Sequence, residues 1–356
     1  MLCSRDSING LSGIGLVVLT RRHLLSLVAI PAALSLVPTR AASPQPIVEA
    51  GFVPIGGIDQ WIEIRGHDRS RPAILFLHGG PCETQSPYLS LFSPWEERYV
   101  VAQWDQRGAG RTYVKNDGAI PNPTFEQLTR DAVEVGRHVQ RRLGVRKLIL
   151  VGHSWGSMLG LSVVRKHPEL FSALVGTGQV VSGRMIIDTL VSSAITRAQA
   201  AGDAQAVADL KRFGRSDLGD WKKLSNLLFK WAPPFSDADL RFLKRRATLV
   251  GPSDSPTGVA GADSGAATPA CLPKFMPYVY DFDASAGGFE LAVPFFVIQG
   301  REDNRALPDV ARAFLRQVHA PSKRYTLIDG GHFACFDNPA GFLKALHEDL
   351  RSLGIS

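Results

Sequence analysis

The sequence lacks several features that would place it in a specialised class of protein. Four cysteines in 356 residues are too few for a disulfide-stabilised scaffold. No run of 18 apolar residues occurs, which argues against a conventional transmembrane helix. The net charge of +7 is spread along the chain, without a Lys/Arg block or a nucleic-acid-binding motif. The histidines show no metal-site spacing. We therefore expect a globular protein that binds no nucleic acid and needs no metal or other cofactor.

Residues 1–42 have the layout of a secretory signal peptide. Arg21 and Arg22 precede an apolar run at 24–37, and small residues follow up to Ala42. The arginine pair resembles a twin-arginine signal, which implies export to a bacterial periplasm and no membrane association after cleavage. An uncut signal anchor is the alternative. If the segment is not a functional signal, the protein is cytoplasmic.

The rest of the chain alternates apolar runs of strand length with amphipathic helical segments. This alternation predicts an α/β fold with a mostly parallel sheet flanked by helices, formed by residues 43–178 and 290–356. A capping box is expected at Thr124 and Gln127, before a helix that ends at Gly144. The expected strands are 73–77, 99–104, 147–151, 170–177, 294–299 and 324–328, and the expected helices are 124–142, 154–167, 308–319 and 338–353.

Residues 179–289 interrupt the alternation and are predicted to form an inserted, mainly helical lid. Helices are expected at 180–201, 204–213 and 220–231. Residues 251–270 are rich in Gly, Ala, Pro and Ser, which predicts a loop.

The most informative motif is G-x-S-x-G at residues 152–156. It follows an apolar strand and precedes a helix, which is the context of a nucleophile elbow. Gly152 and Gly156 provide the space that a tight strand-to-helix turn needs. Ser154 is then placed at a helix N-terminus, where backbone N–H groups favour developing negative charge.

A serine needs a base and an orienting acid to become a nucleophile, and the sequence supplies both in the expected order. Asp303 follows the strand at 294–299, and His332 follows the strand at 324–328. We assign Ser154 as the nucleophile, His332 as the general base and then acid, and Asp303 as the group that orients His332. Glu302 is the alternative acid.

An oxyanion hole needs two N–H donors. The backbone of Trp155 is expected to supply one, and the loop at 78–81 the other, through Gly80 or alternatively Gly79. Consecutive glycines allow this loop to approach a substrate closely.

These motifs resemble the α/β-hydrolase fold and, within it, the prolyl iminopeptidase-like serine peptidases. The resemblance is carried by His-Gly-Gly-Pro at 78–81, Asp-Gln-Arg-Gly at 105–108 and Ser-Trp-Gly-Ser at 154–157. It implies that Asp105, Arg107 and Arg111 have structural roles. It also implies lid glutamates that hold the free α-amino group of the substrate. No glutamate lies between Phe171 and Phe289, although several aspartates do.

The chain also departs from the family pattern at Cys82, where HGGPG is usual. Cys82 and Cys335 follow the two loops that flank the site, so a disulfide between them is one hypothesis, and two unpaired residues are the other. Without the signal the cysteine count is odd, so at least one thiol is free or pairs elsewhere.

The sequence thus predicts a serine hydrolase that forms an acyl-enzyme on a small ester, amide or short peptide. The resemblance implies a proline-type aminopeptidase. An esterase or lactonase without peptidase activity is the alternative from the same class, and a non-catalytic binding protein is the alternative from another. The sequence gives no oligomeric state and no substrate-binding residues.

Overall fold

The structure is a computed structural model, and it describes residues 44–213, 221–249 and 264–355. The chain divides into the unit Met1–Ala42 and the unit Ser43–Ser356. The predicted signal peptide and residues 251–263 of the predicted loop lie outside the described residues. In the described part of the chain, no helix is long and apolar enough to cross a membrane.

Eight strands form one sheet in the second unit. Their bounds are β1 Ile47–Ile55, β2 Ile58–Gly66, β3 Ala73–Leu77, β4 Val100–Trp104, β5 Leu148–His153, β6 Phe171–Thr177, β7 Phe295–Gly300 and β8 Lys323–Ile328. The spatial order is β1-β2-β4-β3-β5-β6-β7-β8. The strands from β4 to β8 pair in parallel, whereas β1 and β2 are antiparallel additions at one edge. The predicted mostly parallel sheet is therefore confirmed.

The helices occupy the connections between these strands and, for α11 and α12, the segment that follows β8. Their bounds are α1 Ser93–Glu96, α2 Gly110–Lys115, α3 Phe125–Leu143, α4 Trp155–Lys166, α5 Gly183–Ala200, α6 Ala204–Arg212, α7 Trp221–Trp231, α8 Asp237–Thr248, α9 Ser264–Asp281, α10 Pro308–Gln317, α11 Ala334–Asp337 and α12 Pro339–Arg351, with short 3-10 turns at Leu89–Leu91, Pro168–Leu170 and Ala284–Gly287.

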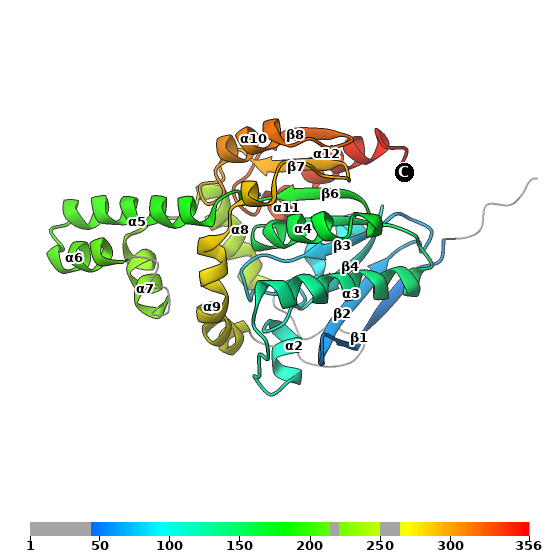
Figure 1. Cartoon of the computed structure of the whole chain (residues 1–356), viewed down its shortest axis with the longest axis horizontal. Helices are drawn as coiled ribbons and strands as arrows, with labels where there is room; N and C mark the ends of the chain where they lie inside the picture. The colour runs from blue at the N-terminus through cyan, green and yellow to red at the C-terminus, as the bar shows by residue number, and fades with distance from the viewer. Residues whose placement is uncertain (1–43, 214–220, 250–263, 356) are drawn as a thin grey trace, which may run out of the picture. The chain divides into compact units, whose positions relative to one another are not determined.

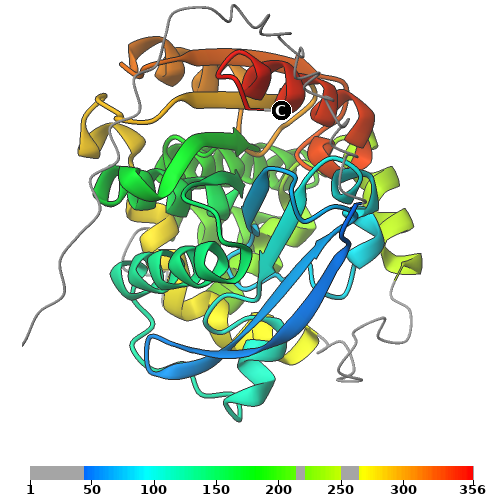
Figure 2. The same ribbon diagram turned by 90° about the vertical axis from the view of Figure 1, so that its right-hand side faces the viewer.

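Side chains that alternate along the central strands fill two cores, one on each face of the sheet. In β3, Leu75 belongs to the core under α3, α4 and α10, and Phe76 belongs to the core under α1, α11 and α12. This is the period of two that a strand covered on both faces requires. Figures 1 and 2 show the sheet and the helices that cover it. Because these apolar strands are buried on both faces, the position at which each strand ends is fixed. The place where the loops after the strands meet is fixed as a result.

The N-terminus of α3 forms only half of the predicted capping box. Thr124 Oγ1 accepts a hydrogen bond from the backbone N–H of Gln127 at 3.0 Å. The side chain of Gln127 does not return to the backbone N–H of Thr124, because its acceptor atom Oε1 takes a hydrogen bond from Arg130 Nη2 at 2.7 Å. The helix ends as predicted, with Gly144 at a φ of 70°.

Helices α5 to α9 lie between β6 and β7, in the segment predicted to be an inserted lid. Helices α5, α6 and α7 agree with the predicted ones and share a small apolar cluster of their own, and α9 contacts both α5 and α2 (Figure 1). The predicted loop at 251–270 is wrong in its last part, because α9 begins at Ser264 despite the prolines at 269, 273 and 277. The sequence did not lead us to expect helix α8 or the hairpin of β1 and β2, which the structure contains. The interpretation of the segment as a lid stays a prediction.

Candidate active site

Ser154 lies in a sharp turn between β5 and α4. Its backbone has φ 53° and ψ −117°, which L-residues rarely adopt. A Cβ atom on Gly156 would lie 2.0 Å from the carbonyl oxygen of Leu77, and one on Gly152 would lie 2.4 Å from that of Gly156. The glycines of the motif are therefore required by contact with backbone atoms, as the sequence predicts.

The structure brings Ser154, His332 and Asp303 into one chain of short contacts. Ser154 Oγ lies 2.9 Å from His332 Nε2. His332 Nδ1 lies 2.9 Å from Asp303 Oδ2 and 3.1 Å from Oδ1. Glu302, the alternative acid, is exposed. These three side chains come from the loops after β5, β8 and β7, which end at the same edge of the sheet.

Asp303 is held firmly in position to orient His332. Its Oδ1 accepts hydrogen bonds from the backbone N–H groups of Arg305 and Ala306, both at 2.9 Å, and its Oδ2 accepts one from Gln299 Nε2 at 2.7 Å. Burial by itself would lower the pKa of His332. The negative charge of Asp303 and the hydrogen bond to it outweigh burial, so the pKa of His332 lies above its ordinary value.

Two other buried histidines support the site in their neutral form. His153 Nε2 donates to the carbonyl oxygen of His332 at 2.9 Å, and burial together with the charge of His332 lowers the pKa of His153 to about 3. Burial lowers the pKa of His78 to about 4. The Nδ1 atom of His78 donates to the carbonyl of Gly79 at 2.8 Å, and its Nε2 accepts from the backbone of Gln106 at 3.2 Å.

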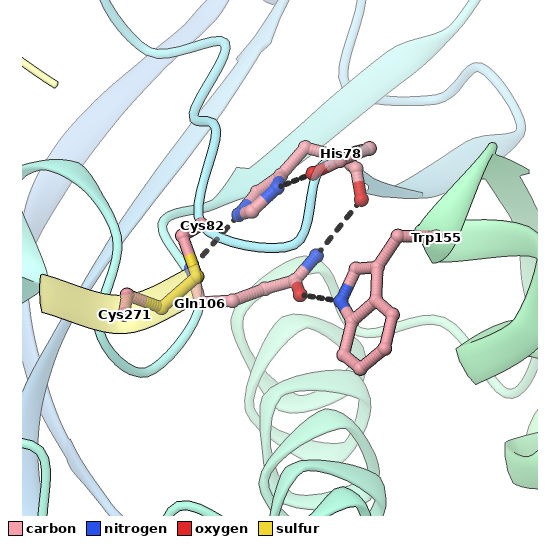
Figure 3. Close-up of a disulfide and its surroundings, with 6 residues drawn as sticks. His78, Cys82, Gln106, Trp155 and Cys271 are labelled. Carbon is pink, nitrogen blue, oxygen red and sulfur yellow. Dashed lines mark hydrogen bonds between the residues drawn. A yellow bond between two sulfur atoms is a disulfide. The ribbon is translucent and has the colours of Figure 1, made fainter. Parts of the chain in front are cut away.

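Gln106 connects the two segments expected to form the oxyanion hole, as Figure 3 shows. Its Oε1 accepts a hydrogen bond from Trp155 Nε1 at 3.0 Å, and its Nε2 donates to the carbonyl of His78 at 3.2 Å. Gly79 and Gly80 follow His78, and a Cβ atom on Gly79 would lie 3.3 Å from Ser154 Cβ. Gln106 is a residue that the motif analysis did not single out, although it lies within the Asp-Gln-Arg-Gly segment.

A cavity of about 310 Å³ opens beside Ser154 and His332. Gly80 and Trp155, the expected oxyanion residues, also line it. Most of its remaining wall is apolar and comes from the segment 179–289, including Ile186, Ile187, Leu272 and Met276. Glu83 and Arg305 also line the cavity, and neither was identified from the sequence. No local signal could have found them, because only the assembled sheet edge brings them to Ser154.

The hypothesis of a Cys82–Cys335 disulfide is wrong, because Cys82 is bonded to Cys271 (Figure 3). Their Cα atoms lie 6.0 Å apart. Cys82 and Cys271 belong to the core on one face of the sheet, whereas Cys335 is a buried free thiol in the core on the other face. The disulfide joins the loop that carries Gly80 to α9, which also lines the cavity.

Among the described residues of the segment 179–289, no aspartate lines the cavity. Asp239 Oδ1 accepts from the backbone N–H of Phe333 at 3.0 Å and its Oδ2 accepts from Ser236 Oγ at 2.8 Å, so Asp239 fixes the loop of His332. Asp203 caps α6 and pairs with Lys230 at 2.9 Å. Asp188 and Asp209 pair with basic residues, Asp237 is exposed, and Asp217 and Asp220 lie outside the described residues.

Asp105, Arg107 and Arg111 contact other protein groups, in agreement with the structural roles expected for them. Arg107 forms a buried ion pair with Asp131 at 2.8 Å. Asp105 accepts hydrogen bonds from Thr84, Ser86 and the backbone of Arg111, and Arg111 lies 4.8 Å above the ring of Trp61. They hold the loops behind the site. In the described part of the chain, no group of three or more His, Cys, Asp or Glu residues could hold a metal ion.

An eight-stranded, mostly parallel sheet with a sharp strand-to-helix turn at Ser154 defines the class of protein. Residues 72–339 match the model of the alpha/beta hydrolase fold family, and the chain belongs to this family. Curated relatives include the probable aminopeptidase YbaC of Bacillus subtilis, 27% identical over 83% of this chain and 94% of the relative. The proline iminopeptidase of Lactobacillus delbrueckii subsp. lactis is 24% identical over 85% of this chain and 97% of its own length. Hydrolase activity is thereby supported.

Solved structures show the same fold. A proline iminopeptidase-related protein of Thermus thermophilus superposes with a TM-score of 0.61 at 22% identity, covering 86% of this chain and 98% of that one. The proline iminopeptidase of Mycobacterium smegmatis gives a TM-score of 0.54 at 16% identity, over 86% and 98% of the two chains.

Proposed function

We propose that the protein is a serine hydrolase that works through an acyl-enzyme. The single observation that carries the proposal is the contact chain from Ser154 Oγ through His332 to Asp303, with both distances to His332 at 2.9 Å. Ser154 is the nucleophile, His332 the general base and then acid, and Asp303 the orienting group.

The reaction follows from these positions. Ser154 Oγ attacks the carbonyl carbon of the substrate and gives its proton to His332 Nε2. The carbonyl oxygen becomes an anion, which the N–H groups of Trp155 and Gly80 stabilise. His332 then protonates the leaving group, and the bond between that group and the carbonyl carbon breaks. Water attacks the acyl-enzyme with His332 as base, which releases the acid and restores Ser154.

We further propose that the substrate is a short peptide with a free amino end, with an N-terminal proline or another small residue. The relatives named as aminopeptidases and proline iminopeptidases support this reaction. Glu83 supports it chemically, because a carboxylate beside the nucleophile is the natural partner of an ammonium group. Glu83 is 44% exposed and lies 3.7 Å from Arg246, so it is not locked in a close ion pair.

An esterase or lactonase is the second candidate. The apolar wall of the cavity favours it, because such a wall accepts an acyl chain as well as a proline ring.

The deciding experiment compares kcat/KM for prolyl- and alanyl-anilides, their N-acetyl forms and short p-nitrophenyl esters. We expect free-amine anilides to be cleaved far faster than acetylated ones, and Ser154→Ala to lose activity by several orders of magnitude. Ester turnover alone, lost in Ser154→Ala, would establish the esterase. Full activity of Ser154→Ala would refute the serine mechanism.

We also propose that the protein is exported through the segment 1–42. The Cys82–Cys271 disulfide supports an oxidising compartment. A fusion of residues 1–42 to a reporter that folds before export tests this, with Arg21→Lys and Arg22→Lys together as the variant that must stay inside the cell.

A further inference from the structure

Arg305 places a positively charged side chain in the wall of the cavity that contains Ser154 and His332. Its guanidinium Cζ lies 4.2 Å from the centre of the Phe235 ring, and its Nη2 donates to the carbonyl of Pro233 at 2.9 Å. Its backbone N–H donates to Asp303 at 2.9 Å. The side chain is therefore fixed in place at the site.

The hydrogen bonding of this guanidinium is incomplete. Within the described ranges, Nη1 of Arg305 is buried without a hydrogen-bond partner, and no carboxylate lies within ion-pair distance of the side chain. The two acids nearby are already occupied: Asp303 contacts His332, and Asp239 accepts from Phe333 and Ser236. A carboxylate is the partner that completes a guanidinium, because two parallel hydrogen bonds match the planar fork.

The strand order places Arg305 and Glu83 on opposite sides of Ser154. Glu83 lies beyond the end of β3, Ser154 follows β5, and Arg305 lies beyond the end of β7, in the order β3-β5-β6-β7. His332 follows β8, so it approaches Ser154 from the side of Arg305. Because His332 protonates the leaving group, that group departs on the Arg305 side.

The spacing fits a short substrate. Three intervals between neighbouring strands separate the ends of β3 and β7 by about 14 Å. An extended dipeptide spans about 7 Å, and two long side chains that reach inward cover the rest.

We propose that Arg305 binds the C-terminal carboxylate of the leaving residue, so that dipeptides with two free ends are the preferred substrates. This inference rests on the proposed serine aminopeptidase function. Ammonium recognition by Glu83 on the acyl side and carboxylate recognition by Arg305 on the leaving side make the cavity complementary to a zwitterion.

The test compares prolyl-alanine with prolyl-alanine amide, with prolyl-anilide as a reference that has no carboxylate. In the unmodified protein we expect kcat/KM to be about 10- to 100-fold higher for the free dipeptide than for its amide, mainly through KM. Arg305→Gln should bring this ratio to about 1, and Arg305→Lys should restore part of it. Arg301→Gln is the matched control, because Arg301 lies in the same loop but pairs with Asp329 outside the cavity.

A purely structural role of Arg305 would lower activity on all three substrates together and leave the ratio unchanged, which would overturn the proposal. Equal rates for dipeptide and amide, or cleavage of anilides and esters without any cleavage of dipeptides, would overturn it as well. In these cases turnover still depends on Ser154, so the serine hydrolase function stands. Failure of Ser154→Ala to lose activity would instead refute the underlying function.

Discussion

The indole nitrogen of Trp155, the residue directly after Ser154, donates a hydrogen bond to the side-chain oxygen of Gln106 at 3.0 Å. Through its amide nitrogen, Gln106 also holds the carbonyl of His78. Trp155 and the loop that carries Gly79 and Gly80 are thus fixed relative to each other by one amide group. Because both segments are proposed to supply oxyanion donors, we expect Gln106 to affect catalysis through their positions.

Replacing Gln106 should therefore lower kcat more than it raises KM. We expect Gln106→Leu to reduce kcat by about 10- to 100-fold, since small displacements of catalytic groups carry costs of this size. Gln60→Leu is the matched control. Gln60 accepts a hydrogen bond from the indole of Trp104 at 2.8 Å, away from the cavity. Steady-state kinetics of both variants are compared at equal extents of folding. An equal reduction of kcat in Gln106→Leu and Gln60→Leu would contradict the positioning role of Gln106.

The pH dependence of activity should report the raised pKa of His332. As a general base His332 must be neutral, so activity falls as the pH drops through its pKa. Asp303 holds that pKa above the ordinary 6.5, which places the acid limb of kcat/KM above pH 6.5. His153 and His78 stay neutral throughout this range because burial lowers their pKa values to about 3 and about 4.

The variant Asp303→Asn should shift this limb to lower pH, because it removes the charge that raises the pKa. It should also reduce kcat by about 10⁴-fold through loss of the productive tautomer. Glu302→Gln changes a neighbouring exposed carboxylate and should leave the profile in place. An acid limb unchanged in Asp303→Asn would show that the limb does not belong to His332.

Short-range patterns were sufficient to predict that Ser154, Asp303 and His332 meet and that a sharp turn holds Ser154, because each residue closely follows a strand whose apolar run is visible in the sequence. Gly152 and Gly156 are constrained by backbone atoms only a few residues away or in the adjacent strand. Glu83 and Arg305 could not be identified in this way, since their proximity depends on the order of β3, β5 and β7 in the sheet.

The cysteines illustrate the same limit. Proximity of Cys82 and Cys335 to the two site loops favoured their pairing, but the two residues point into cores on opposite faces of the sheet. The true partner, Cys271, lies in α9, whose proline-rich sequence is typical of a loop. Packing of α9 against α2, which no local pattern encodes, brings Cys271 to Cys82.

The disulfide should stabilise the protein that lacks residues 1–42 and leave one of its thiols free. Denatured protein that starts at Ser43 should show one reactive thiol without reductant, Cys335, and three after reduction. Reduction should lower the free energy of unfolding by about 2–4 kcal/mol. Three thiols before reduction would contradict the pairing.

Variants at Cys82 separate the effect of the disulfide on stability from the effect of backbone strain at this position. Cys82 has a φ of 73°, where glycine is favoured. Cys82→Gly and Cys82→Ala both lose the disulfide, but Cys82→Gly should be more stable by about 1 kcal/mol. Urea denaturation of the two variants measures the difference, and equal midpoints would show that the left-handed conformation is not retained without the bond.

Two glycines of α4 should respond very differently to the same substitution. A Cβ atom on Gly156 would lie 2.0 Å from the backbone oxygen of Leu77, whereas one on Gly160 would first meet the end of the Leu174 side chain at 2.9 Å. A side-chain methyl can rotate away, but the carbonyl of Leu77 belongs to β3 and cannot move without disturbing the sheet.

Gly156→Ala should therefore cost about 3 kcal/mol or more and displace Ser154 from His332. Gly160→Ala should change stability by about 1 kcal/mol or less, because the gain in helix propensity offsets the tighter packing. Thermal or urea unfolding together with kcat measures both effects, and a fully active Gly156→Ala would mean that the elbow is looser than its contacts indicate.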